Sequence, residues 1–139
     1  MTPEQIALVQ GSFRQVTPMA ARIADLFYGR LFELAPEVRP LFSDDLAEQK
    51  KKLMQMLGLA VTGLNSPETL LPAVVGLGER HREYDVSPEH YASVGEALIW
   101  ALGQGLGEAF TDEVAMAWAA VYGTLADVMI GASSSAARA

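Results

Sequence analysis

The sequence contains no cysteine, and this absence excludes several kinds of chemistry. A chain without cysteine has no disulfide framework, no thiolate nucleophile, no iron–sulfur ligand and no thioether link to a cofactor. The N-terminus also lacks a basic region followed by an apolar core, which a secretory signal needs. Both features are compatible with a reducing compartment, so we expect a cytoplasmic location.

Basic residues are scarce. The chain has 10 lysines and arginines against 17 aspartates and glutamates, and its formal net charge is -7. A nucleic-acid interface needs clustered basic side chains for phosphate contacts, so this balance argues against a nucleic-acid partner. The basic run 50–52 fits the solvated face of an amphipathic helix better than an anion site, which stays an alternative.

Long apolar runs and nucleotide-binding glycine motifs are missing too. No uninterrupted apolar stretch approaches the length of a membrane span, so we expect no membrane partner. No G-x-G-x-x-G motif is present, and 139 residues leave no room for flavin and nicotinamide domains beside a helical core. We expect one domain spanning residues 1–139, in which the small residues of 131–139 form a frayed tail.

What the sequence does contain is a series of helix starts. Three segments place a hydroxyl at the N-cap, proline in the first turn and glutamate after it: Thr2-Pro3-Glu4, Ser66-Pro67-Glu68 and Ser87-Pro88-Glu89. Further starts are indicated at Thr17-Pro18, Ser43-Asp44-Asp45 and Thr111-Asp112-Glu113. Apolar residues recur at helical spacing, and no alternating run predicts a strand. We therefore predict an all-α fold of six to seven helices.

Three polar side chains lie on helix faces that are otherwise apolar. They are Tyr28 in the segment from about 19 to 34, Gln49 at the start of 49–60, and His81 at the end of 67–81. A buried phenol or amide needs a hydrogen-bond partner, so this pattern predicts a hydrophobic slot around a ligand. Taken alone, His81 is explained better as a hydrogen-bonded core or helix-end residue, and a plain helical bundle is an alternative for the chain.

Five segments then carry a resemblance that covers nearly the whole chain. They are FYGRLF at 27–32, APEVRPLF at 35–42, RH at 80–81, HY at 90–91 and AWAAVYG at 117–123. In order and spacing, these segments resemble the bacterial single-domain globins related to the haem domain of flavohaemoglobins. The resemblance implies a globin fold around a haem pocket.

The same resemblance implies roles for individual residues. His81 is expected to be the proximal ligand of the iron in a non-covalently bound haem b, with Tyr91 packed beside it. Tyr28 and Gln49 are expected on the distal side, facing the bound gas, with Leu53 as an apolar neighbour of the sixth site. The two neutral donors would favour dioxygen over carbon monoxide, because bound dioxygen carries more negative charge.

Further residues have expected roles around the haem, and one position departs from the family pattern. Phe42 is expected to stack on the porphyrin, and Pro36 to mark the corner before it. Relatives of flavohaemoglobins usually carry a glutamate late in the last helix, which joins a network with Tyr91 and His81, whereas ungapped register places Ser133 there. Candidates for pairing with the haem propionates are Arg39, Arg80 and Arg82.

The function implied is gas binding by haem, with dioxygen, nitric oxide and carbon monoxide as ligands. The resemblance also implies conversion of nitric oxide to nitrate, and sustained turnover would then need a separate reductase. Oxygen storage, delivery or sensing without turnover uses the same pocket and stays an alternative. A helical interaction module without cofactor is the third possibility.

Overall fold

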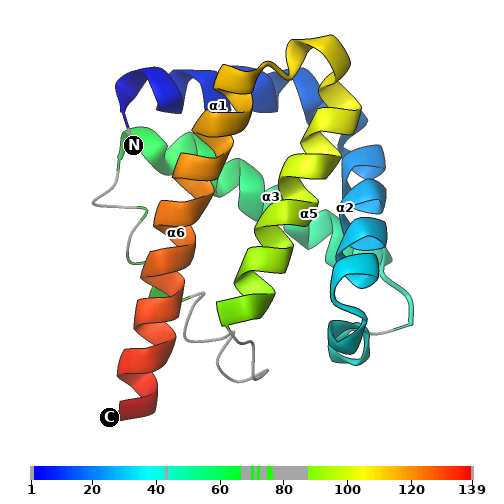
Figure 1. The fold of residues 1–139 in the computed structure, drawn as a ribbon, viewed down its shortest axis with the longest axis vertical. Coiled ribbons are helices and arrows are strands. Elements are labelled where there is room, and N and C mark those ends of the chain that lie inside the picture. Colours follow the sequence, from blue (N-terminus) through cyan, green and yellow to red (C-terminus); the bar gives the residue numbers. More distant parts are fainter. Residues whose placement is uncertain are drawn as a thin grey trace.

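The computed structural model describes residues 2–42, 44–66 and 88–138, together with Leu70, Pro72, Val75 and Gly76. Side chains are described as far as residue 130. This part of the chain is helical and contains no strand (Figure 1), which confirms the all-α prediction. Its elements are α1 (Pro3–Val16), η1 (Thr17–Met19), α2 (Ala20–Leu34), η2 (Pro36–Leu41), α3 (Ala47–Thr62), η3 (Gly63–Asn65), α5 (Pro88–Leu106), η4 (Gly107–Ala109) and α6 (Asp112–Arg138), where η denotes a 3-10 helix.

Most of the predicted helix starts coincide with helix starts in the structure. Thr2 caps α1 through a capping box, in which its hydroxyl accepts from the Gln5 N–H and the Gln5 side chain accepts from the Thr2 N–H. Thr111 caps α6, since its hydroxyl accepts from the Val114 N–H at 3.2 Å.

Other predicted starts differ in detail. Thr17-Pro18 begins a 3-10 helix that leads into α2, and Pro88 begins α5. The acidic segment at 43–45 does not start a helix itself: α3 begins at Ala47, whose N–H donates to the Asp45 carboxylate at 2.9 Å. The carboxylate thus satisfies a free N–H of the first turn from two residues upstream. The start predicted at 66–68 falls largely outside the described residues.

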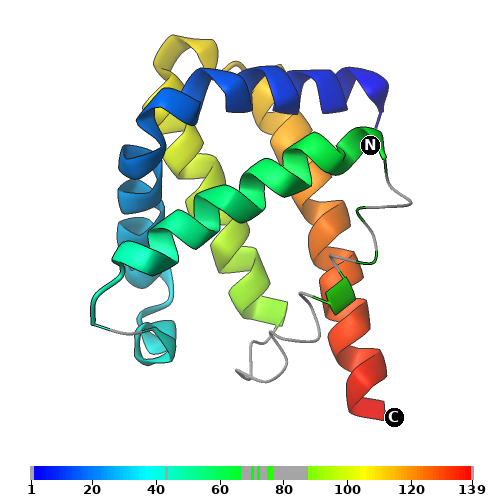
Figure 2. The ribbon, with the colours of Figure 1, turned by 180° about the vertical axis from the view of Figure 1, so that it is seen from behind.

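Two pairings of helices build most of the core. Helix α2 packs on α5, and α1 lies across the end of α5 and packs on α6 (Figure 1). Seen from behind, α3 runs obliquely across the bundle, and it contacts α1 and α2 (Figure 2). The largest fully buried side chains come from α1, α2 and α5; they are Ile23, Leu102, Val9 and Val16. The apolar side chains of α3, such as Leu53 and Leu57, are mostly partly buried.

A polar link runs through this core between the first helix and the last. The Trp118 indole N–H of α6 donates to the Ser12 hydroxyl of α1 at 2.8 Å, and that hydroxyl donates to the Leu8 carbonyl at 2.7 Å. The Phe13 ring lies 6.4 Å from the Trp118 ring. A buried indole N–H needs an acceptor, so Ser12 allows the largest aromatic side chain to be buried without an unsatisfied donor.

The C-terminal segment differs from the predicted frayed tail. Helix α6 continues to Arg138, through most of 131–139. Alanine has the highest intrinsic helix propensity, so a segment rich in alanine can extend an existing helix beyond the packed core. Residues Asp112–Ile130 are long and apolar enough to cross a membrane by length and composition, but core helices meet the same criterion, and Trp118 and Val121 are buried in the bundle.

Candidate functional site

Tyr28 lies at the centre of the candidate site. It belongs to the face of α2 that also carries Ala24 and Leu31, all of which are buried, and only 3% of its surface is exposed. Burial raises the pKa of the phenol above its ordinary value of 10, while a hydrogen bond with the Gln49 side chain acts in the opposite direction. The phenol therefore stays protonated at neutral pH and can donate a hydrogen bond.

Three aromatic rings form a triangle at this point. The Tyr28 ring lies 5.6 Å from Phe42 and 5.9 Å from Phe32, and the Phe32 and Phe42 rings are 5.7 Å apart. Two of the three contacts are edge-to-face, the arrangement that aromatic quadrupoles favour. Phe27 adds a fourth ring, which meets Tyr28 edge-on at 4.9 Å. The phenol thus projects from an aromatic wall toward α3.

Helix α3 supplies the opposite wall. Gln49 lies in its first turn, and Leu53 follows one turn later on the same face; both are partly buried. Beside them, the Lys50 ammonium pairs with the Asp25 carboxylate of α2 at 2.8 Å. Lys51 and Lys52 are exposed, which agrees with the predicted solvated face of this basic run. The ion pair joins α2 and α3 next to the point where the Gln49 side chain approaches the Tyr28 phenol.

Tyr91 lies apart from this group, near the start of α5, and is buried. The Tyr122 hydroxyl of α6 donates to the Tyr91 backbone carbonyl at 2.6 Å. The pKa of Tyr122 is raised, first because of burial and then because of its electrostatic interaction with Tyr91. This bond fixes the turn of α5 that carries Tyr91 against α6. Next to Tyr91, the His90 imidazole lies 3.5 Å from the Glu37 carboxylate of η2.

The structure does not describe most of the predicted proximal residues. His81, Arg80 and Arg82 lie outside the described residues, as does the side chain of Ser133. Pro36 begins η2 and so lies at the corner expected of it. The structure therefore brings together Tyr28, Gln49 and Phe42, places Leu53 beside Gln49, and leaves the predicted contact between His81 and Tyr91 as a prediction.

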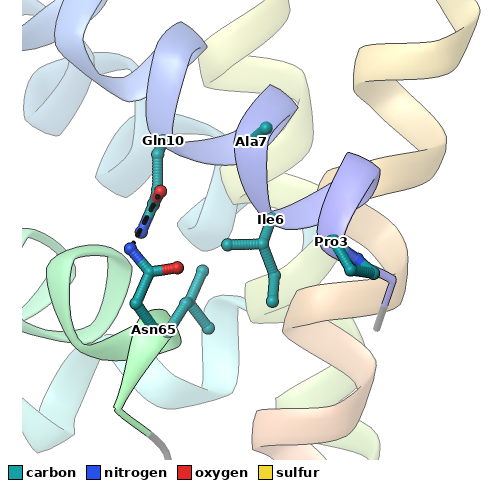
Figure 3. A pocket seen from close by; sticks show the side chains of 6 residues that line it. Pro3, Ile6, Ala7, Gln10 and Asn65 are labelled. Carbon is teal, nitrogen blue, oxygen red and sulfur yellow. Dashed lines mark hydrogen bonds between the residues drawn. The ribbon is translucent and has the colours of Figure 1, made fainter.

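A separate hollow lies between α1 and η3 and has a volume of about 300 Å³. Figure 3 shows its lining, with Ile6 and Ala7 on one side and the Gln10 and Asn65 amides facing each other at 3.5 Å. It opens at the far end of α3 from Gln49, roughly 20 Å away along the helix axis at 1.5 Å per residue. This hollow is therefore distinct from the site around Tyr28.

In the part of the chain that the structure describes, the helices pack into an all-α fold with an apolar site where the polar side chains of Tyr28 and Gln49 meet aromatic rings. The globin family model matches residues 25–129, and the chain belongs to the globin family. The flavohemoprotein of Bordetella parapertussis is 37% identical over 135 residues, which cover 94% of this chain and 33% of that protein. The flavohemoprotein of Rhodopirellula baltica is 35% identical over 125 residues, or 85% of this chain and 31% of that protein. The chain thus spans about a third of the length of these relatives.

Solved structures show the same fold over the whole chain. A bacterial globin from Campylobacter jejuni superposes with a TM-score of 0.87 at 25% identity, covering 99% of this chain and 100% of that one. An engineered carbene transferase, made from a candidate nitric oxide dioxygenase of Rhodothermus marinus, gives 0.88 at 25% identity, covering 99% and 96%. The flavohemoglobin of Malassezia yamatoensis, solved with bound FAD and haem, gives 0.80 at 21% identity and covers 96% of this chain and 37% of that one.

Haem is the cofactor that membership of this family supports, and the described residues fit it. The buried phenol faces an amide across two helices, and the half-buried Phe42 and Leu53 offer apolar surface beside them. Neutral donors set in apolar walls suit a flat, largely apolar macrocycle that holds a small polar ligand.

Sequence reasoning missed two interactions at this site. Arg39 contacts Phe42 and Phe32, although its sequence suggested a propionate partner, and Lys50 forms its ion pair with Asp25. Arg39 and Phe42 are close in sequence, but their contact depends on η2 ending at Leu41 and on the extended backbone of Phe42, which residue spacing does not indicate. The sequence around Asp25 and Lys50 gives no signal for their ion pair, because this contact depends on how α2 and α3 cross.

Proposed function

We propose that this chain is a haem-dependent gas-binding globin domain in which Tyr28 and Gln49 donate hydrogen bonds to dioxygen, and that it converts nitric oxide to nitrate when an electron donor is supplied. The observation that carries the proposal is the buried Tyr28 phenol in an aromatic triangle, with the Gln49 side chain of α3 close enough to influence its pKa. When bound, haem supplies an iron centre that binds diatomic gases and exchanges electrons.

The residues divide the work of holding the cofactor. His81 would provide the imidazole that holds the haem iron, as the family resemblance implies, and Tyr91 would pack beside it from α5. Phe42 would lie against the macrocycle, since its half-buried ring is held edge-on to Tyr28. Leu53, one turn after Gln49, would keep the gas site apolar and restrict the entry of water.

The distal residues would discriminate between gases by charge. The Tyr28 phenol, whose pKa is raised by burial, stays a neutral donor, and the Gln49 amide adds a second N–H donor. Donors of this kind stabilise dioxygen, which takes up electron density from the iron, more than carbon monoxide, which takes up little. Neither side chain is a strong ligand for ferrous iron, so the gas site stays open to small molecules.

The net reaction that this site supports is NO + O₂ + e⁻ → NO₃⁻. Both oxygen atoms of dioxygen join the nitrogen of nitric oxide, and one electron per cycle would have to be supplied to balance the charge of nitrate. That electron would come from a flavin-dependent reductase outside these 139 residues. The same donors also suit oxygen storage, delivery or sensing, in which no electron is consumed.

Rapid mixing separates these functions. Oxygenated haem-loaded protein mixed with one equivalent of nitric oxide should yield one equivalent of nitrate and ferric haem, and NADH alone should not restart the reaction. Adding NADH and a flavin reductase should restore consumption. Nitrate formation well below one equivalent would leave oxygen binding without turnover as the function, and continued consumption with NADH alone would contradict the need for an outside donor.

Two variants test the assigned residues in the same experiment. His81→Ala should lose most of its haem, which the Soret absorbance of the purified protein measures. Tyr28→Phe should keep its haem but release dioxygen about tenfold faster, because one hydrogen bond of ~1.5 kcal/mol is lost. Release of carbon monoxide should change much less. Equal changes for both gases would show that Tyr28 acts through packing and not as a donor.

A further inference from the structure

Arg39 lies where two walls of the candidate site meet. It belongs to η2, the short helix between α2 and the segment that leads to α3, and it is partly buried. Its Cζ atom lies 5.1 Å from the centroid of the Phe32 ring on α2. One of the three rings in the aromatic triangle is therefore in contact with this guanidinium.

The same guanidinium binds the backbone beyond η2. Its Nη1 atom donates to the Phe42 carbonyl at 3.3 Å, and its Nη2 atom donates to the Asp44 carbonyl at 3.2 Å. η2 ends at Leu41, and Phe42 is extended with φ -115° and ψ 154°, so the carbonyls of this segment have left the helical pattern. A planar guanidinium holds two such carbonyls with donors in a fixed fork, whereas the three donors of an ammonium have no planar arrangement.

These contacts form a connected network of side chains and backbone around the site. Arg39 holds the Phe42 backbone and the Phe32 ring, and those two rings meet each other and the Tyr28 ring at 5.6 to 5.9 Å. Movement of residues 42–44 away from α2 would therefore break the contact that limits the Tyr28 ring on one side. This use of the guanidinium differs from the propionate pairing suggested by its sequence.

We infer that Arg39 is a positioning residue of the gas site, which fixes the Phe42 corner against Phe32 and thereby directs the Tyr28 phenol toward the ligand. The inference rests on the proposed role of Tyr28 as the donor to dioxygen. Lysine at this position keeps the positive charge, but it lacks both the planar pair of N–H donors and the planar group that stacks on the Phe32 ring.

The test compares Arg39→Lys with a matched control, Arg30→Lys, in the haem-loaded protein. Arg30 also stacks on an aromatic ring, lying 5.4 Å from Trp100, and pairs with Glu33 at 3.1 Å, but it has no part in the triangle. The first measurement is hydrogen exchange of the peptide covering 40–46 in the carbon monoxide complex. Arg39→Lys should speed exchange there by about tenfold and Arg30→Lys should not, because only the former frees this segment.

The second measurement is the ratio of dioxygen to carbon monoxide dissociation rates. Arg39→Lys should raise dioxygen release about fivefold with little change for carbon monoxide, and it should add nothing in a Tyr28→Phe background. Unchanged exchange at 40–46 would overturn the inference, and so would a rise in both gas rates by the same factor. If Tyr28→Phe itself leaves the ratio of the two dissociation rates unchanged, Tyr28 is not the donor, and the positioning role of Arg39 is wrong with it. If Tyr28→Phe changes the ratio as expected but Arg39→Lys does not, only the role of Arg39 is refuted.

Discussion

The Gln49 side chain of α3 lies close enough to the Tyr28 phenol of α2 to oppose the rise in its pKa that burial causes. The two helices are tied together at the same level by the ion pair between Asp25 and Lys50. Both donors are therefore held in place by protein contacts before any gas arrives. A preorganised pair needs little rearrangement when it turns to a ligand, which is the condition for strong electrostatic stabilisation.

The first prediction concerns the ionisation of this phenol. Gln49→Leu should raise the pKa of Tyr28 further, because the hydrogen bond that lowers it is lost while burial remains. The pH titration of carbon-13-labelled tyrosine followed by NMR measures the shift. Gln55→Leu is the matched control, since Gln55 is exposed on the same helix. A lowered or unchanged pKa in Gln49→Leu would show that the two side chains do not interact in solution.

The second prediction follows from two tyrosines with raised pKa values, Tyr28 and Tyr122. In the unfolded chain both phenols ionise near pH 10, whereas in the folded protein they hold their protons to higher pH. The unfolded state therefore binds fewer protons above pH 10, and the free energy of unfolding falls as pH rises. This contribution is fully present below about pH 10 and is lost progressively above it.

Urea unfolding at about pH 8 and about pH 11 measures this loss. Tyr122→Phe should be less stable than wild type at the lower pH by about 0.5–1.5 kcal/mol, because the bond to the Tyr91 carbonyl is lost. The same variant should lose less stability than wild type between the two pH values. An equal loss in both proteins would mean that Tyr122 ionises as freely in the folded state as in the unfolded one.

Contacts between residues close in sequence can be predicted from the sequence more readily than contacts between separate helices. Helix starts such as Thr2 and Thr111 are local, because the capping hydroxyl and its N–H lie three residues apart, and both were predicted. The membership of Tyr28 and Gln49 in one site is indicated by their polar tips on apolar faces and by the family resemblance, and that of Phe42 by the resemblance alone. The roles of all three, like those of His81, Leu53 and Tyr91, remain predictions.

Interactions between helices could not be predicted in the same way. The bond from Tyr122 to Tyr91 depends on the crossing of α5 and α6, and that of Arg39 depends on where η2 ends. Neither the crossing angle nor the last turn of a 3-10 helix can be read from residue spacing, because tertiary packing sets both. The extent of α6 differs from the prediction for a related reason: small residues predict fraying, but alanine also extends helices, and α6 continues to Arg138.

The third prediction compares two glycines within helices. A Cβ atom at Gly95 of α5 would lie 2.6 Å from a Tyr122 ring carbon, whereas one at Gly123 of α6 would meet nothing within 4 Å. Gly95→Ala should therefore destabilise the protein by about 1–3 kcal/mol through overpacking against the ring. Gly123→Ala should stabilise it by roughly 0.5–1 kcal/mol, because alanine loses less entropy in a helix. Urea unfolding of the two variants measures the difference, and the same sign for both would contradict the close approach at Gly95.

The last prediction concerns the buried link between α1 and α6. Ser12→Ala leaves the Trp118 indole N–H without its acceptor at 2.8 Å, in a part of the core where Trp118 is only 2% exposed. The free energy of unfolding should fall by about 1–3 kcal/mol, the cost of a buried donor left unsatisfied. Ser93→Ala is the control, because the Ser93 hydroxyl also bonds a carbonyl one turn back but lies at the surface, and its loss should cost less than about 0.5 kcal/mol. Trp118→Phe removes the donor itself, so adding Ser12→Ala to that variant should cost much less than adding it to wild type. Equal costs in the two backgrounds would show that Ser12 stabilises the protein through its bond to the Leu8 carbonyl, not by accepting from Trp118.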